Sequence, residues 1–186
     1  MNRREALTAT TALMGSAIIG SQAFLSGCNR TEPKVEGFSD DVLTLLDEIG
    51  ETILPATTSS PGAKASKIGE FMKVIVTDCY SPAEQKTFFE GISVIQQEAK
   101  KKYDTSFTKL TDRQKFDMML SFDQEAQNAS DKNENQEHFF TMLNQLTVWG
   151  FFSSDPGATK ALRYVPIPGR YEGCIPYREG EGAWVY

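Results

Sequence analysis

Apolar residues recur at spacings of three and four along most of this chain, and that spacing constrains the fold more than any other feature. After Ser39, whose side chain can cap a helix, such residues form one apolar face between Val42 and Ile53. Four later segments repeat the pattern. No segment alternates apolar and polar residues over six positions, as a half-buried strand would. The sequence therefore predicts an all-α fold, a small bundle of about five helices.

Turn and capping residues set the bounds of these helices. Pro55 ends the first helix, and the turn-forming residues 55–62 follow it as a loop. Ser81–Glu84 and Thr111–Gln114 both have the capping-box pattern, in which two side chains satisfy free N–H groups at a helix start. We expect the Phe, Met and Trp residues at helical spacing to lie in the core. The five helices are expected over residues 39–54, 63–79, 82–101, 111–129 and 137–152.

The segment from Ser153 to Tyr186 differs from the rest of the chain. It has four prolines, five glycines, no helical period and five of the eight Tyr and Trp residues, although disordered tails are poor in aromatic residues. Because Tyr, Trp and Arg dominate protein–protein hot spots, we expect this long irregular segment to wrap the bundle and present part of a binding surface. The alternative, that it only seals its own core, stays open. The partner-binding candidates are Arg163, Tyr164, Arg170, Tyr171, Tyr177 and Trp184.

Residues 1–27 have the organisation of an export signal. Arg3 and Arg4 stand in a short polar start, and no charged residue follows Glu5 before Arg30. A basic head before a weakly apolar stretch of small residues is more typical of a signal than of a membrane span. Paired arginines favour the twin-arginine route, which carries folded cargo, and Sec export remains the alternative.

The signal ends at Leu25–Cys28, which resembles a bacterial lipobox. In such a sequence Cys28 receives lipid and becomes the mature N-terminus, and several acyl chains together give a stable membrane anchor. Ordinary cleavage or an uncleaved anchor is the alternative. We therefore predict an export signal over residues 1–27, a tether over 28–38 and a single helical domain over 39–186. The protein is expected to be a membrane-anchored lipoprotein in the periplasm.

Two cysteines, Cys79 and Cys174, remain once the signal is removed. Because the periplasm is oxidising, a pair of cysteines there usually forms a disulfide. A bond between these two would close a long loop and stabilise the fold by roughly 2–4 kcal/mol. A bond to a partner subunit and two free buried thiols are the alternatives.

Little in the composition supports catalysis or a bound cofactor. The net charge of −6 and a pI of about 4.9 oppose nucleic-acid binding. The chain has one histidine and three cysteines, and no dinucleotide, phosphate-loop, haem-attachment or nucleophile-elbow motif. The histidine, His138, stands at a predicted helix start, and we interpret it as a structural residue rather than a general base or metal ligand. We therefore expect no catalytic, cofactor-binding or metal-binding residues.

Several short motifs follow one another in a recognisable order. They are Ile53–Thr57, Ser60–Ala63, Phe71–Met72, Asp78–Tyr80, Leu146–Ser154, Gly157–Tyr164 and Pro166–Cys174. In this order, and together with the twin-arginine-like leader, they resemble the gluconate 2-dehydrogenase subunit 3 family. The resemblance covers about residues 40–180, and its later motifs are the stronger ones.

The resemblance implies the small, cofactor-free subunit of a membrane-associated dehydrogenase complex. The large subunit of such a complex is a flavoprotein of the glucose–methanol–choline type, which holds FAD and oxidises sugars or sugar acids. A c-type cytochrome subunit, with haem c, often takes the electrons. The small subunit is thought to supply the export signal and to support maturation of its partner. The lipobox departs from the general pattern and would tether the complex directly. A stand-alone envelope lipoprotein, acting as a binding or scaffold module, is the alternative interpretation.

Overall fold

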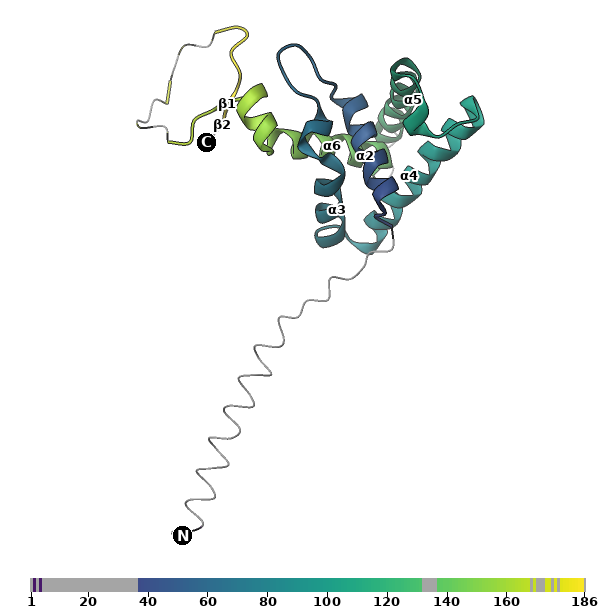
Figure 1. Ribbon diagram of the computed structural model, residues 1–186, viewed down its shortest axis with the longest axis horizontal. Helices are drawn as coiled ribbons and strands as arrows, with labels where there is room; N and C mark the ends of the chain where they lie inside the picture. The colour runs from purple at the N-terminus through teal and green to yellow at the C-terminus, as the bar shows by residue number, and fades with distance from the viewer. Residues whose placement is uncertain are drawn as a thin grey trace. The chain divides into compact units, whose positions relative to one another are not determined.

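Figure 1 shows the computed structural model of the chain. The structure describes residues 2, 4, 37–131, 137–167, 169, 173, 174, 176 and 178–185. The chain divides into two units, residues 1–35 and 36–186, and the second carries the elements labelled in the figure. These elements are α2 (Asp40–Ile53), η1 (Ala63–Ser66), α3 (Ile68–Asp78), α4 (Pro82–Tyr103), η2 (Phe107–Lys109), α5 (Asp112–Asp131), α6 (Phe139–Phe152), η3 (Gly157–Ala161), β1 (Arg163–Tyr164) and β2 (Trp184–Val185).

The prediction of an all-α bundle is confirmed. The first residues of α4 and α5 show how the local sequence determines where each helix begins. At the start of α4, the N–H of Ser81 donates to the Glu84 carboxylate at 2.7 Å, which forms the predicted capping box. At the start of α5, the N–H of Thr111 donates to the Gln114 side-chain oxygen at 3.0 Å. Both contacts join residues three positions apart, so the sequence alone is enough to predict them.

The predicted helix over residues 63–79 is in fact two helices. The 3₁₀ helix η1 ends at Ser66. The next residue, Lys67, has a left-handed backbone with φ of 50°, and α3 begins directly after it. The carboxylate of Glu51 holds this region, because it accepts from the N–H groups of Ala56 and Lys64, each at 2.9 Å. The left-handed Lys67 separates the two helices, although the apolar spacing continues through the break.

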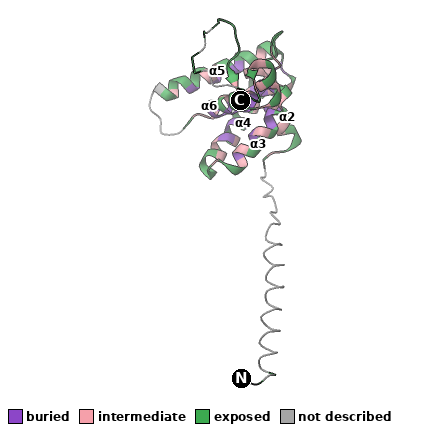
Figure 2. Cartoon of the chain, turned by 90° about the vertical axis from the view of Figure 1, so that its left-hand side faces the viewer, coloured by how far each residue is buried: buried purple, intermediate pink, exposed green. Residues whose placement is uncertain are grey.

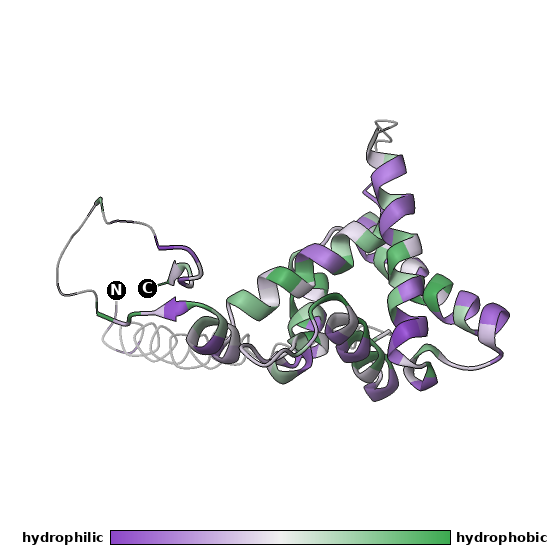
Figure 3. Ribbon diagram, turned by 90° about the horizontal axis from the view of Figure 1, so that it is seen from above, coloured by the Kyte–Doolittle hydropathy of each residue, from purple (hydrophilic) through white to green (hydrophobic). Residues whose placement is uncertain are grey.

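The core lies where α2, α3, α4, α5 and α6 meet (Figure 2). Hydrophobic residues gather between the helices, and hydrophilic ones cover the outer turns (Figure 3). Phe88 on α4 and Phe151 on α6 are among its largest fully buried side chains. The expectation that every Phe, Met and Trp at helical spacing is buried is wrong at two positions. Phe116 on α5 is 49% exposed and Trp149 on α6 is 54% exposed, because each helix packs against its neighbours through another face.

A nearly buried lysine joins α5 to α2. Lys115 Nζ donates to Glu48 Oε2 at 2.7 Å, and Lys64 of η1 pairs with the other carboxylate oxygen. The side chain of Lys115 is 9% exposed and that of Glu48 is 19% exposed. Partial burial raises the pKa of Glu48, but the hydrogen bonds from the two lysines together outweigh it, so the pKa lies below its ordinary value. One carboxylate thus holds three elements together.

We expect acid to weaken the fold through Glu48. A carboxyl group with a lowered folded-state pKa stabilises the fold above its unfolded pKa, and this contribution is lost as the pH falls through the folded pKa. Below the ordinary value of 4.5, the free energy of unfolding should fall more steeply in the unaltered chain than in Glu48→Gln. Urea unfolding between about pH 7 and about pH 3 measures both slopes, and parallel slopes would contradict the prediction.

Candidate functional site

The C-terminal segment closes into a loop through its two short strands. β1 and β2 pair in parallel, with Arg163 opposite Trp184. The N–H groups of Arg163 and Val165 donate to the carbonyl oxygens of Ala183 and Val185 at 2.9 and 3.0 Å. The sequence analysis did not predict this pairing, because strands of two residues are too short to show an alternating pattern.

Side chains reinforce the closure. The guanidinium carbon of Arg163 lies 3.9 Å from the centre of the Trp184 ring, which is a cation–π contact. Glu181 lies near two arginines, with its carboxylate 3.7 Å from Arg163 and 3.9 Å from Arg178. The structure therefore brings together two of the predicted partner-binding residues, Arg163 and Trp184. A third, Tyr164, is 47% exposed and follows Arg163 on β1.

The expected wrapping of the bundle is not found in the part of the tail that the structure describes. Between residues 163 and 185, the described side chains are exposed except Val165 and Val185, which are half-buried. Ile167 is 82% exposed. Because the two strands pair with each other beyond η3, the described residues of the tail neither cover the helices nor seal their core (Figure 1). The other candidates, Arg170, Tyr171 and Tyr177, lie outside the described residues.

A sharp turn connects α6 to this loop. Gly157 permits it, since a Cβ at that position would collide with the carbonyl group of Phe151. The Ser154 hydroxyl accepts from the N–H of Gly157 at 3.2 Å and lies 2.8 Å from the hydroxyl of Ser66 in η1. An open depression of about 740 Å³ lies beside the turn, lined by Ser59, Ser60, residues 160–163 and residues 180–182. The loop over residues 55–62, η3 and the tail thus share one surface.

A second exposed surface lies on α3 and α6. Phe71 and Trp149 meet edge to face, with ring centres 5.3 Å apart and planes at 87°. Val74 lies one turn beyond Phe71 on α3, and Phe152 lies one turn beyond Trp149 on α6. Val74 is 56% exposed, Trp149 54% and Val148 41%. We call these five residues the α3–α6 face: Phe71, Val74, Val148, Trp149 and Phe152.

Sequence reasoning missed the α3–α6 face because it assigned such residues to the core. A signal was available in the composition of α6, whose fourteen residues include no charged side chain. A helix without charged residues is often covered on more than one side, although α6 does place the polar residues Thr141, Asn144 and Gln145 outside the core. In the described structure α6 is covered on one side, with Val148 and Trp149 exposed on the other.

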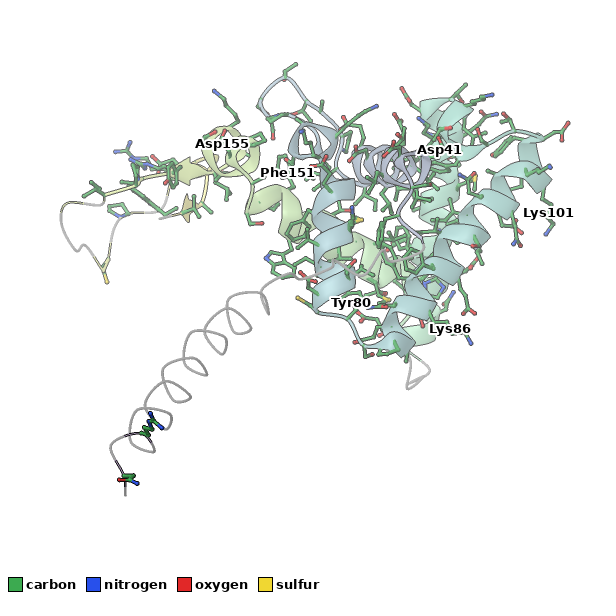
Figure 4. All side chains as sticks on the ribbon, turned by 60° about the horizontal axis from the view of Figure 1, so that its bottom comes forward. Asp41, Tyr80, Lys86, Lys101, Phe151 and Asp155 are labelled. Carbon is green, nitrogen blue, oxygen red and sulfur yellow. The ribbon has the colours of Figure 1, made fainter. Side chains whose placement is uncertain are left out.

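The two remaining cysteines are free and exposed. Cys79 follows the end of α3, whereas Cys174 lies in the tail between β1 and β2. Figure 4 shows Tyr80, the residue after Cys79, at the far end of α3 from the labelled residues Phe151 and Asp155 on the tail side. The expected intramolecular disulfide is therefore absent, and the alternative of buried thiols is also wrong. A bond to a partner subunit stays a prediction.

The predicted structural role of His138 is confirmed, since its Nδ1 accepts from the N–H of Phe140 at 3.2 Å and caps α6. In the part of the chain that the structure describes, no three His, Cys, Asp or Glu side chains gather as a metal site requires. No helix of that part is both long enough and apolar enough to cross a bilayer. Arg4 is exposed, and the export and lipidation residues Arg3 and Cys28 lie outside the described residues.

Comparison with known proteins gives one family match. The model of a family described as gluconate 2-dehydrogenase subunit 3 matches residues 40–169, from the start of α2 into the tail. No curated protein and no solved structure matches the chain. The matched region contains the α3–α6 face together with Arg163 and Tyr164, and it leaves out the leader and Trp184.

Proposed function

Because the chain belongs to the gluconate 2-dehydrogenase subunit 3 family, we propose that it is the non-catalytic small subunit of a periplasmic, flavin-dependent sugar or sugar-acid dehydrogenase complex. The family match over almost the whole helical body carries this proposal. As a member of this family, the chain is an accessory subunit of a multi-subunit dehydrogenase. The identity of its partners, its export route and its anchor are the further steps that we propose.

The proposed partner is a large flavoprotein subunit of the glucose–methanol–choline type, which binds FAD and carries the catalytic site. A c-type cytochrome with haem c is the proposed third subunit. The exposed aromatic residues of the small subunit support a role in assembly, since Trp149 and Trp184 are 54% and 40% exposed. The chain has one histidine and no cofactor motif, so we assign the redox chemistry to the flavin of the partner.

The leader, which lies outside the family match, supports an export role. The twin-arginine route moves folded cargo, so a small subunit that carries Arg3 and Arg4 can take a bound, folded flavoprotein with it. Lipid on Cys28 would then hold the complex at the periplasmic membrane face. In this arrangement one small protein escorts, stabilises and anchors the enzyme.

Replacing Arg3 and Arg4 together with lysine should leave the partner flavoprotein in the cytoplasm. The exchange keeps the positive charge but removes the paired arginines of the export signal, so we expect at least about a tenfold loss of flavoprotein from the periplasmic membrane fraction. Cell fractionation, affinity purification of the small subunit and the flavin absorption spectrum of the product measure the effect. Arg30→Lys is the matched control, because it makes the same exchange in the tether and should change nothing.

Two outcomes would contradict the proposal in different ways. A flavoprotein that still reached the periplasm with the double substitution would remove the escort role and leave the subunit role intact. A colourless, partner-free protein purified from unaltered cells would remove the subunit role itself and favour a stand-alone lipoprotein.

A further inference from the structure

α6 is the one described α-helix that has no charged residue. Leu143, Leu146 and Phe151 bury its inner side in the core. Its outer side exposes Val148 and Trp149 to solvent. Soluble proteins place charged or polar residues on the solvent side of such helices, and contiguous exposed apolar residues mark interaction sites. The C-terminal part of the outer side, which exposes Val148 and Trp149, therefore has the composition of a surface covered in a complex.

The aromatic pair of the α3–α6 face is positioned before any partner arrives. The ring of Phe71 packs over Gly150, where a Cβ would lie 2.5 Å from Phe71 Cδ1. Trp149 then meets the same ring edge to face at 5.3 Å. A supported, exposed tryptophan loses less conformational entropy on binding than a free side chain would. Tryptophans of this kind are typical anchors of protein interfaces.

The charges around the face indicate what kind of surface it fits. Thr141 and Gln145 continue the outer side of α6 without a charge, and Gln145 Nε2 donates to the Glu137 carboxylate at 3.0 Å. The exposed charges beside the face are Glu70 and Lys73 on α3 and Glu137 before α6, whereas its aromatic centre carries none. A charged partner group over that centre would lose water without gaining an opposite charge. Membrane-surface helices carry several Lys and Arg residues around their apolar face, whereas this chain has a net charge of −6, α3 has a single lysine, Lys73, and α6 has no basic residue. An uncharged protein surface therefore fits better than a lipid surface.

We propose that the α3–α6 face binds an uncharged, apolar segment of the catalytic flavoprotein subunit. This inference rests on the proposed function, which supplies that partner. The face also continues toward the tail, because α6 contacts η3 and η3 contacts β1, where Arg163 stacks on Trp184. Figure 4 shows Phe151 near the end of α6 and Asp155 beyond that end, on the side of the tail. One large subunit can cover both surfaces, with the α3–α6 face as the apolar centre and the arginines of the tail at the rim.

A single aspartate placed on the face tests the proposal. Val74→Asp and Val148→Asp alter side chains that are 56% and 41% exposed, so the free subunit should fold normally, as circular dichroism can check. An unpaired carboxylate buried against an apolar partner should weaken binding of the flavoprotein by at least about tenfold. The readouts are the dissociation constant and the ratio of flavin absorbance to small subunit after affinity purification. Val94→Asp, on α4 and 38% exposed, is the matched control and should bind normally.

The outcomes separate this inference from the function on which it rests. If the unaltered chain retains the flavoprotein and both variants retain it equally well, the inference is overturned and the subunit role stands. If the unaltered chain retains no flavoprotein, the proposed subunit role is contradicted, and this inference is overturned with it. If the variants lose binding to phosphatidylglycerol-containing vesicles but bind the flavoprotein normally, the face binds lipid. If the free chain is a dimer that Val148→Asp dissociates without loss of the flavoprotein, the face binds a second copy of the chain. Either result overturns the inference.

Discussion

Glu48→Ala should lower the free energy of unfolding by about 3 kcal/mol, which is large for a polar residue outside the hydrophobic core. The substitution leaves Lys115 Nζ without its carboxylate partner, which lies 2.7 Å away in the unaltered chain. The Lys115 side chain is only 9% exposed, so its ammonium group cannot simply return to water. Removing one member of a buried ion pair typically costs 3–5 kcal/mol. We take the lower end because Glu48 is 19% exposed and the lysine can partly move toward solvent.

The control for this prediction is a substitution of the other member of the ion pair, Lys115. Lys115→Met removes the buried charge and keeps most of the volume, while Glu48 keeps Lys64 as a partner. Because the Glu48 side chain is 19% exposed and keeps Lys64, its carboxylate is not left as an unpaired buried charge, so we expect a loss below about 1 kcal/mol. The double substitution of Glu48→Ala with Lys115→Met should therefore be more stable than Glu48→Ala alone. Urea or guanidinium unfolding of all four proteins measures the difference, and equal losses in the two single variants would contradict the argument.

The same cluster shows where prediction from sequence stops. The capping boxes at Ser81 and Thr111 join residues three positions apart, so a local pattern predicts them. Lys115 and Glu48 are 67 positions apart and meet only because α5 packs on α2. No periodicity reports such a contact, and an isolated lysine in an amphipathic helix reads as a solvent-facing residue. Long-range packing therefore decides which charged residues are buried.

For the candidate surfaces too, the sequence predicts local features but not long-range contacts. The composition of the tail predicts a segment that takes part in interactions, and in the structure two of its candidate residues, Arg163 and Trp184, are in contact. The wrapping expected of that segment depends on contacts between distant parts of the chain, and its described residues instead pair strand to strand. The α3–α6 face escaped prediction because Trp149 has the spacing of a core residue. Apolar spacing locates a helix, but it cannot say which of two apolar sides another element covers.

Phe88→Ala should destabilise the fold by about 3–5 kcal/mol, the usual range for removing a fully buried phenylalanine. Phe88 has no exposed surface, and its ring centre lies 6.2 Å from that of Phe38 and 5.7 Å from that of Phe89. Truncation to alanine would leave a cavity between α4 and the start of α2, which the packed helices can fill only in part. The lost contacts and the cavity both destabilise the folded state.

Phe116→Ala is the matched control, since the spacing of apolar residues predicts a buried ring at both positions. Phe116 is 49% exposed, and its described contact is with the guanidinium of Arg113, 5.8 Å from the ring centre. We expect a loss of about 0.5 kcal/mol, typical of surface substitutions. Denaturant midpoints at unchanged m-value measure both losses. If Phe116→Ala cost as much as Phe88→Ala, the outer face of α5 would have to be covered in solution, which would contradict the exposure of Phe116.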